Sequence, residues 1–194
     1  MQIIQKKKAN KHTFTFNENQ FNFAYEDKSG SGDIDLNYAA FPQKNSVRIE
    51  QNEWLRNVGF LWCLLGLLQI GLAINSGSSL SGKGFWLLIG SICIAWAHFS
   101  KVKYSVFHSE HGNIFIIQDK KHDEIIDELN SRRKKQLLDW HGEINHENNL
   151  QDEIEKFRWL AEQKIMTTEE AEKKIAQLEL LNKDDFNTSG DQLN

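Results

Sequence analysis

The sequence predicts an α+β membrane protein in which a two-helix transmembrane hairpin is inserted into a small antiparallel β domain. Three observations predict this arrangement. Residues 57–100 contain a single charged residue, Lys83, although 26% of the whole chain is charged. Apolar and polar residues alternate on both sides of this block, as they do in strands that bury one face. Helical periodicity follows toward the C-terminus, where we expect a helix that caps the sheet and then a short helical hairpin.

The residues before the apolar block favour β structure. We interpret residues 1–10 as an N-terminal tail and residues 11–53 as a β-rich half-domain. Residues 12–27, HTFTFNENQFNFAYED, form two alternating runs around an asparagine-containing turn. A second turn at 28–33, KSGSGD, and the only proline, Pro42, delimit two further short strands. Four strands are therefore predicted before residue 50.

The apolar block has the layout of two helices joined by a polar loop. We expect the hairpin to occupy 54–100, with spans at about 57–75 and 84–100 and a connector rich in serine and glycine. A bilayer crossing takes about 20 apolar residues, with roughly 17 to 25 tolerated. Both predicted spans are short but apolar on all sides, whereas a helix of a soluble protein keeps a polar face. A buried hairpin in a soluble protein is the alternative.

Basic residues predict how the hairpin is oriented. The connector holds only Lys83, whereas basic residues flank the block outside the hairpin: Lys44, Arg48, Arg56, Lys101 and Lys103. Cytoplasmic loops carry an excess of lysine and arginine, so both termini are expected in the cytoplasm.

Small residues recur along both spans. Gly59, Gly66 and Ala73 are spaced by seven residues, and so are Gly90 and Ala97. Small side chains let helix backbones approach closely in a membrane, where lipid gives no hydrophobic drive to association. They could pack the two helices on each other or pack protomers together, and the candidate residues are Gly59, Gly66, Ala73, Gly90, Ser91, Ala95 and Ala97.

Residues 101–140 predict two more strands and a helix. The strands meet at a turn around His111, and Asp119 is a reasonable N-cap for the helix. Six strands and one helix could form a single domain around the hairpin. This order of elements, with the segment GNIFIIQDKKHDEIIDEL (112–129), resembles a bacterial pleckstrin-homology-like (PH-like) domain, a family whose members often carry a transmembrane hairpin. The resemblance implies a multi-pass protein of the bacterial inner membrane.

After a linker at 141–149, residues 150–182 predict a helical hairpin. Thr167 and Glu170 have capping-box spacing, and Thr168 is the alternative cap. The stretch KIMTTEEAEKKIAQL (164–178) resembles the bacterial SHOCT (short C-terminal) domain, although Lys164 stands where that family usually has glycine. The resemblance implies assembly or regulation through a protein partner or a homo-oligomer. Residues 183–194 are polar, and we predict disorder there.

A basic run in the predicted helix is a candidate for contact with anionic lipid. Basic residues near an anionic leaflet gain about 1 kcal/mol each. The run consists of Arg132, Arg133, Lys134 and Lys135, and Lys6 to Lys8 with Lys11 extend the candidate surface. A solvated helix face is the alternative. The net charge is −4, so we expect no nucleic-acid partner.

No residue set specifies a reaction. The sequence has no phosphate-cradling glycine loop, no nucleophile elbow and no HExxH motif. His108, Glu110 and His111 lie in one turn and could contribute metal ligands, but such spacing is common in polar turns. We assign no catalytic residue, no metal and no cofactor.

These observations favour a non-enzymatic interaction or assembly module that is anchored in the membrane. The alternative is a small oligomeric channel or membrane effector that a cytoplasmic ligand gates. The near absence of polar residues in the spans counts against a pore, and an enzyme is the least favoured class.

Overall fold

The computed structural model describes residues 1–190, with side chains described up to 182, and shows an α+β chain. The described part holds two antiparallel sheets and five α-helices. In chain order the elements are β1 (Gln2–Lys7), β2 (Asn10–Phe16), β3 (Gln20–Asp27), β4 (Gly30–Asn37), the 3-10 turn η1 (Tyr38–Ala40), β5 (Asn45–Glu50), α1 (Glu53–Asn75), α2 (Phe85–Phe99), β6 (Val102–Ser109), β7 (Gly112–Ile117), α3 (His122–His141), α4 (Leu150–Glu162) and α5 (Thr168–Gly190).

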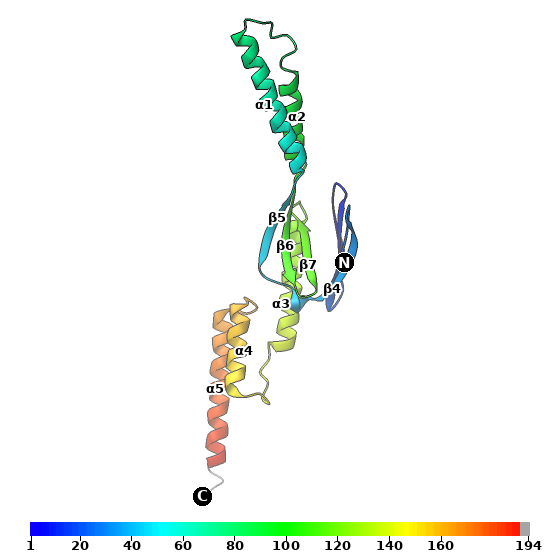
Figure 1. The fold of residues 1–194 in the computed structure, drawn as a ribbon. Helices are drawn as coiled ribbons and strands as arrows, with labels where there is room; N and C mark the ends of the chain where they lie inside the picture. Colours follow the sequence, from blue (N-terminus) through cyan, green and yellow to red (C-terminus); the bar gives the residue numbers. More distant parts are fainter. Residues whose placement is uncertain (191–194) are drawn as a thin grey trace.

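Figure 1 shows an elongated molecule with the two sheets in the middle. The hairpin α1–α2 projects from one end, and the pair α4–α5 lies at the other. The first sheet has the order β1-β2-β3-β4 and the second the order β5-β6-β7. The hairpin is inserted between β5 and β6, which pair directly, with Glu50 opposite Val102. The insertion therefore leaves the second sheet continuous.

The predicted N-terminal tail is wrong, because residues 2–7 form strand β1 and pair with β2. Ile3 and Gln5 point inward and are 5% and 1% exposed. The Gln5 amide accepts a hydrogen bond from the Ile117 backbone N–H at 2.9 Å and donates to the Ile117 carbonyl at 2.7 Å. A buried glutamine in place of an apolar residue hides the alternation, so seven strands form where six were expected.

One core joins the segments before and after the hairpin. Phe14, Phe21 and Phe23 of the first sheet pack with Ile114 of β7 and Leu129 of α3, and all five are fully buried. Burying such a side chain stabilises the fold by roughly 1.5–3 kcal/mol relative to exposure. Residues 107–129 thus complete a core that residues 3–41 begin.

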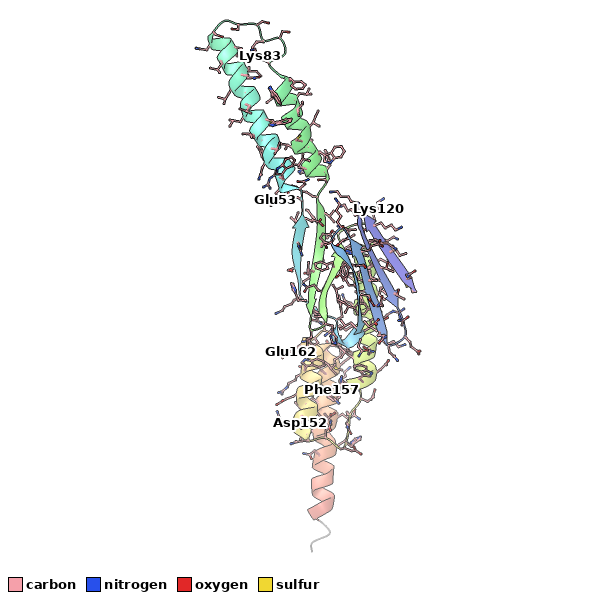
Figure 2. The ribbon with its side chains drawn as sticks, turned by 45° about the vertical axis from the view of Figure 1, so that its right-hand side comes forward. Glu53, Lys83, Lys120, Asp152, Phe157 and Glu162 are labelled. Carbon is pink, nitrogen blue, oxygen red and sulfur yellow. The ribbon has the colours of Figure 1, made fainter. Side chains whose placement is uncertain are left out.

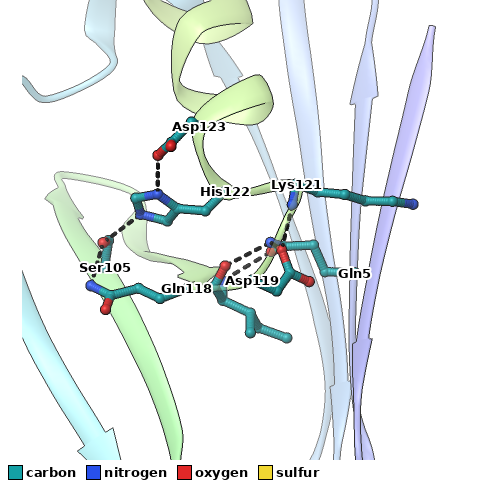
Figure 3. Close-up of polar contacts among 8 residues, drawn as sticks. Gln5, Ser105, Gln118, Asp119, Lys121, His122 and Asp123 are labelled. Atoms are coloured by element: carbon teal, nitrogen blue, oxygen red, sulfur yellow. Dashed lines mark hydrogen bonds and ion pairs between the residues drawn. The ribbon is translucent and has the colours of Figure 1, made fainter.

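Polar contacts attach the start of α3 to both sheets (Figure 3). The Gln5 amide donates to Asp119 Oδ1 at 2.7 Å, and Asp119 Oδ1 accepts the Lys121 backbone N–H at 2.9 Å. Asp119 therefore caps the turn before α3, and the helix begins at His122, later than expected from an N-cap at Asp119.

A second core forms where α4 and α5 meet the C-terminal end of α3. It contains Leu137 of α3, Phe157 and Leu160 of α4, and Ala171 and Leu178 of α5. Between the two helices, the Thr167 backbone N–H donates to Glu170 Oε2 at 2.8 Å, and the Glu170 N–H donates to Thr167 Oγ1 at 3.2 Å. The predicted capping box at Thr167 is confirmed. The predicted disordered tail, 183–194, falls partly in α5, which ends at Gly190, and partly outside the described residues.

Candidate membrane-contacting hairpin and its base

Large apolar side chains cover the outside of the hairpin. The exposed ones on the two helices are Trp54, Phe60, Leu61, Leu64, Leu65, Leu67, Leu68, Leu72, Ile74, Phe85, Trp86, Leu88, Ile92, Trp96 and Phe99. Soluble proteins rarely expose a contiguous apolar surface of more than a few hundred Å². Within the described residues, α1 is the one helix long and apolar enough to cross a membrane, judged by length and composition.

The two helices differ in length. At about 1.5 Å per residue, α1 is about 34 Å long and α2 about 22 Å, against a hydrocarbon core of roughly 30 Å. Asn52 starts α1 by accepting the Leu55 backbone N–H at its Oδ1 at 3.0 Å. The predicted second span, 84–100, corresponds to the 15-residue helix Phe85–Phe99, which is too short to pass the same test.

The small residues predicted to pack are divided between the inside and the outside of the hairpin. Buried between α1 and α2 are Gly59, Gly66, Ala73, Gly90 and Ala97. A Cβ at Gly66 would lie 2.6 Å from the Leu87 backbone nitrogen, and one at Gly90 would lie 2.7 Å from the Cys63 nitrogen. Ser91 and Ala95 are instead exposed, and Ser91 Oγ lies 3.9 Å from Cys63 Sγ of α1. Five of the seven candidates therefore pack the helices of one chain on each other.

Lysines gather at the base of the hairpin. We call Lys8, Lys101, Lys103, Lys120 and Lys121 the basal lysines. The Lys8 ammonium, on the β1–β2 turn, donates to the Ser100 carbonyl at the end of α2. Lys121 donates to the Ile4 carbonyl at 2.9 Å. Figure 2 shows Lys120 at the end of the sheets nearer the hairpin and Lys83 at the hairpin's far tip. Five lysines thus lie where the apolar surface ends, together with the acidic residue Glu53 in the first turn of α1.

The predicted lipid-contact run, Arg132 to Lys135, lies in the half of α3 farther from the hairpin (Figure 1). Arg132 donates to Glu128 Oε1 at 2.6 Å and to the Asn17 carbonyl at 2.8 Å. Arg133 is 6% exposed and donates to Gln163 Oε1 at 3.1 Å. Both guanidinium groups bind within the protein, whereas Lys134 and Lys135 are exposed. A lipid role therefore does not fit the two arginines. The sequence shows that four basic residues are consecutive, but it shows neither that Arg133 is buried nor that the run lies far from the hairpin.

Sequence reasoning missed a serine–histidine–aspartate contact (Figure 3). Ser105 Oγ lies 2.8 Å from His122 Nε2, and His122 Nδ1 lies 2.7 Å from Asp123 Oδ1. The order of groups matches that of a hydrolytic triad. However, Ser105 is 1% exposed, so a substrate has no approach to its oxygen, and the Asp123 side chain is 92% exposed to water. We interpret the contact as one that joins α3 to β6.

The histidine turn does not gather ligands. His108 Nε2 lies 3.1 Å from Ser46 Oγ, and His108 Nδ1 lies 2.7 Å from Asn113 Oδ1. In the described part of the chain, no group of three or more histidine, cysteine or acidic residues could hold a metal ion.

In comparisons with family models, curated proteins and solved structures, nothing matches the chain.

Proposed function

We propose that this chain is a non-enzymatic interaction module held in the bacterial inner membrane by the hairpin α1–α2. The observation that carries the proposal is the apolar exterior of the hairpin, where large side chains are exposed all round. In water this surface would drive aggregation, whereas in lipid it needs no partner. The shorter α2 would be accommodated by local thinning of the bilayer, at a cost of fractions of a kcal/mol per Å of mismatch.

The basal lysines support the orientation in the proposal. Positive charge lies at the base of the hairpin, and the far tip carries only Lys83. Cytoplasmic leaflets are anionic, and lysines close to their surface gain about 1 kcal/mol each. The two sheets, α3 and the α4–α5 pair therefore belong to the cytoplasmic side, with both termini there.

The PH-like and SHOCT-like resemblances are parts of the same proposal. Two antiparallel sheets followed by α3 fit the expected order of a PH-like domain. Lys164 supports the SHOCT-like part, because its φ of 56° is a conformation that favours glycine, the residue usual in that family.

The pair α4–α5 is the proposed partner-binding arm. A groove of about 520 Å³ runs along it, with Ala161, Ile175 and Ala176 among its apolar residues and charged residues at its sides, Arg158 and Glu162 among them. An apolar groove with charged sides suits an amphipathic helix of a protein partner or of another copy.

Cysteine labelling tests the membrane part. With Cys63 and Cys93 replaced by serine, Ser79→Cys probes the connector and Ser131→Cys, on α3, is the control. We expect a membrane-impermeant thiol reagent to label Ser79→Cys in intact cells and to leave Ser131→Cys unlabelled until the cells are opened. Protein in the soluble fraction would contradict anchoring. A membrane-bound protein with both positions protected would indicate a hairpin that enters the bilayer without crossing it.

Light scattering in detergent tests the assembly part. We expect Ala176→Glu, which places a charge in the groove, to reduce the size of the assembly. The neighbouring change Gln177→Glu adds the same charge at an exposed position beside the groove and serves as the control. If deletion of residues 150–194 leaves the size unchanged, the arm has no role in assembly.

A further inference from the structure

A polar pocket of about 370 Å³ opens between the two sheets. Its walls come from β2, β3 and the turn after it, β5, β6 and β7, so it exists only when both sheets are assembled. Small-molecule sites typically measure roughly 300–1,000 Å³ and combine aromatic walls with a few polar groups. The pocket has the size and the composition of such a site.

Opposite charges line the pocket without neutralising each other. Arg48 and Glu50 lie two residues apart on one face of β5, and both line the pocket. Neither takes part in an ion pair within the described residues. Asp27 adds a second carboxylate, whose pKa is held below its ordinary value by hydrogen bonds from Ser29. One cation and two anions therefore face the same space.

Neighbouring groups position the charged side chains. The Arg48 guanidinium lies over the Phe115 ring, 5.9 Å from its centroid. Glu50 Oε2 accepts the Tyr104 hydroxyl at 2.8 Å and the Asn10 amide at 3.1 Å. These contacts hold the carboxylate in place and leave Glu50 Oε1 without a protein donor among the described residues. A ligand would therefore meet preorganised charges.

Aromatic rings form the rest of the wall. His12 stacks on Tyr104 with ring centroids 5.7 Å apart, and Tyr104 meets Phe115 edge to face at 6.2 Å. Burial lowers the pKa of His12, and its Nδ1 has no hydrogen-bond partner among the described residues. The rings offer faces on which an apolar or aromatic group packs.

We infer that this pocket binds a small zwitterion of the α-amino acid class. The ligand carboxylate pairs with Arg48, whose planar guanidinium suits two parallel hydrogen bonds. The ligand ammonium lies between Glu50 and Asp27, and the ligand side chain packs on Tyr104 and Phe115. A simple anion would face two carboxylates, and a simple cation would face Arg48. Of the three, only the zwitterion offers an anionic group to Arg48 and a cationic group to Glu50 and Asp27. This inference goes beyond the proposed anchoring and does not depend on it, because no residue of the hairpin lines the pocket.

Calorimetry of the full-length protein in detergent tests the inference. The twenty standard α-amino acids are titrated singly, and saturable binding is expected for at least one. The matched probes are the decarboxylated amine and the deaminated acid of the tightest binder. Each should bind roughly tenfold more weakly or worse, because each loses one charge-assisted contact.

Two variants show which residue binds each end of the ligand. Arg48→Gln should weaken binding of the amino acid roughly tenfold and should not weaken binding of the amine, which no longer faces a like charge. Glu50→Gln should weaken binding of the amino acid and should not weaken binding of the deaminated acid, for the same reason. A variant that only unfolded the pocket would weaken the binding of the amino acid, the amine and the deaminated acid alike. Asp33→Asn, an exposed change elsewhere on the first sheet, is the control and should leave every affinity unchanged. The inference fails if no amino acid binds, or if the amine or the acid binds as tightly as the amino acid.

Discussion

Lys164 has a left-handed backbone conformation in the turn between α4 and α5, with φ of 56°. The turn is closed by the Ile165 N–H, which donates to the Leu160 carbonyl at 2.9 Å. A residue with a Cβ loses about 1 kcal/mol or more in this conformation, and glycine does not. We expect Lys164→Gly to slow hydrogen exchange across α4 and α5 by a corresponding factor of roughly five.

The control for this prediction is Lys134→Gly, which replaces an exposed lysine inside α3. Glycine in a helix interior costs about 1 kcal/mol, so this change should speed exchange in α3. If Lys164→Gly sped hydrogen exchange in α4 and α5 as much as Lys134→Gly speeds it in α3, the conformational argument would be contradicted.

Glu153 is a buried carboxylate that fastens the linker before α4. Its oxygens accept the Asn145 backbone N–H at 3.1 Å, the Asn148 amide at 2.8 Å and the Lys156 ammonium at 2.6 Å. Burial raises the pKa of Glu153, but the donors outweigh it, and the pKa lies below the ordinary value. The carboxylate therefore contributes stability above its unfolded pKa of about 4.3, and this stability is lost as pH falls through the lower folded pKa.

The expected result is faster hydrogen exchange in residues 142–156 as pH falls below about 4, after correction for the intrinsic pH dependence of exchange. Glu153→Gln should remove this extra acid sensitivity and lower the local stability at pH 7 by about 1–3 kcal/mol. The exposed neighbour Glu155 gives the matched variant Glu155→Gln, for which no change is expected. A wild-type profile retained in Glu153→Gln would assign the acid sensitivity to another group.

Among the elements, the hairpin depends on close approach of its two helices. Gly66 and Gly71 both lie in α1. A Cβ at Gly66 would meet the backbone of α2 at 2.6 Å, whereas no described residue comes within 4 Å of a Cβ at Gly71. Alanine is favoured over glycine in a helix by about 1 kcal/mol at either position. We expect Gly71→Ala to raise the melting temperature in detergent and Gly66→Ala to lower it, measured by circular dichroism. A rise in both variants would show that the helices are not packed as described.

Most helices and strands could be predicted from the sequence, because the pattern of apolar and polar residues within each segment indicates its secondary structure. The alternation in 12–27 reflects strands that bury one face. The apolar run of α1 reflects a helix whose outside is apolar on all sides. Strand β1 escaped prediction because Gln5 is satisfied by Ile117, a residue 112 positions away. The pocket between the sheets could not be predicted at all. Arg48 and Glu50 on β5 share this pocket with Asp27 on β3 only because the second sheet, in which β5 pairs with β6, lies against the first sheet.

At the scale of the whole molecule, the hairpin and the two sheets are separable. β5 and β6 pair in register from Asn45 opposite Phe107 to Glu50 opposite Val102, and the first core contains no residue of α1 or α2. The sheets and α3 therefore hold their own core, and the role proposed for the hairpin is to place the chain at the membrane. Replacing residues 51–101 by Asn-Gly would join the paired ends of β5 and β6 through a two-residue turn, the connection that antiparallel strands favour.

We expect this deletion variant to be folded and to move from the membrane fraction to the soluble fraction. Its amide spectrum should retain dispersed signals for the buried strands, because Phe14, Phe23 and Ile114 keep their neighbours. A control that replaces only the connector, residues 76–84, by a glycine–serine loop of equal length should stay in the membrane, since both apolar helices remain. A deletion variant that aggregates without a dispersed spectrum would show that the sheets need the hairpin to fold. A folded variant that stays with the membrane would instead place the anchor in the four basal lysines that remain, Lys8, Lys103, Lys120 and Lys121.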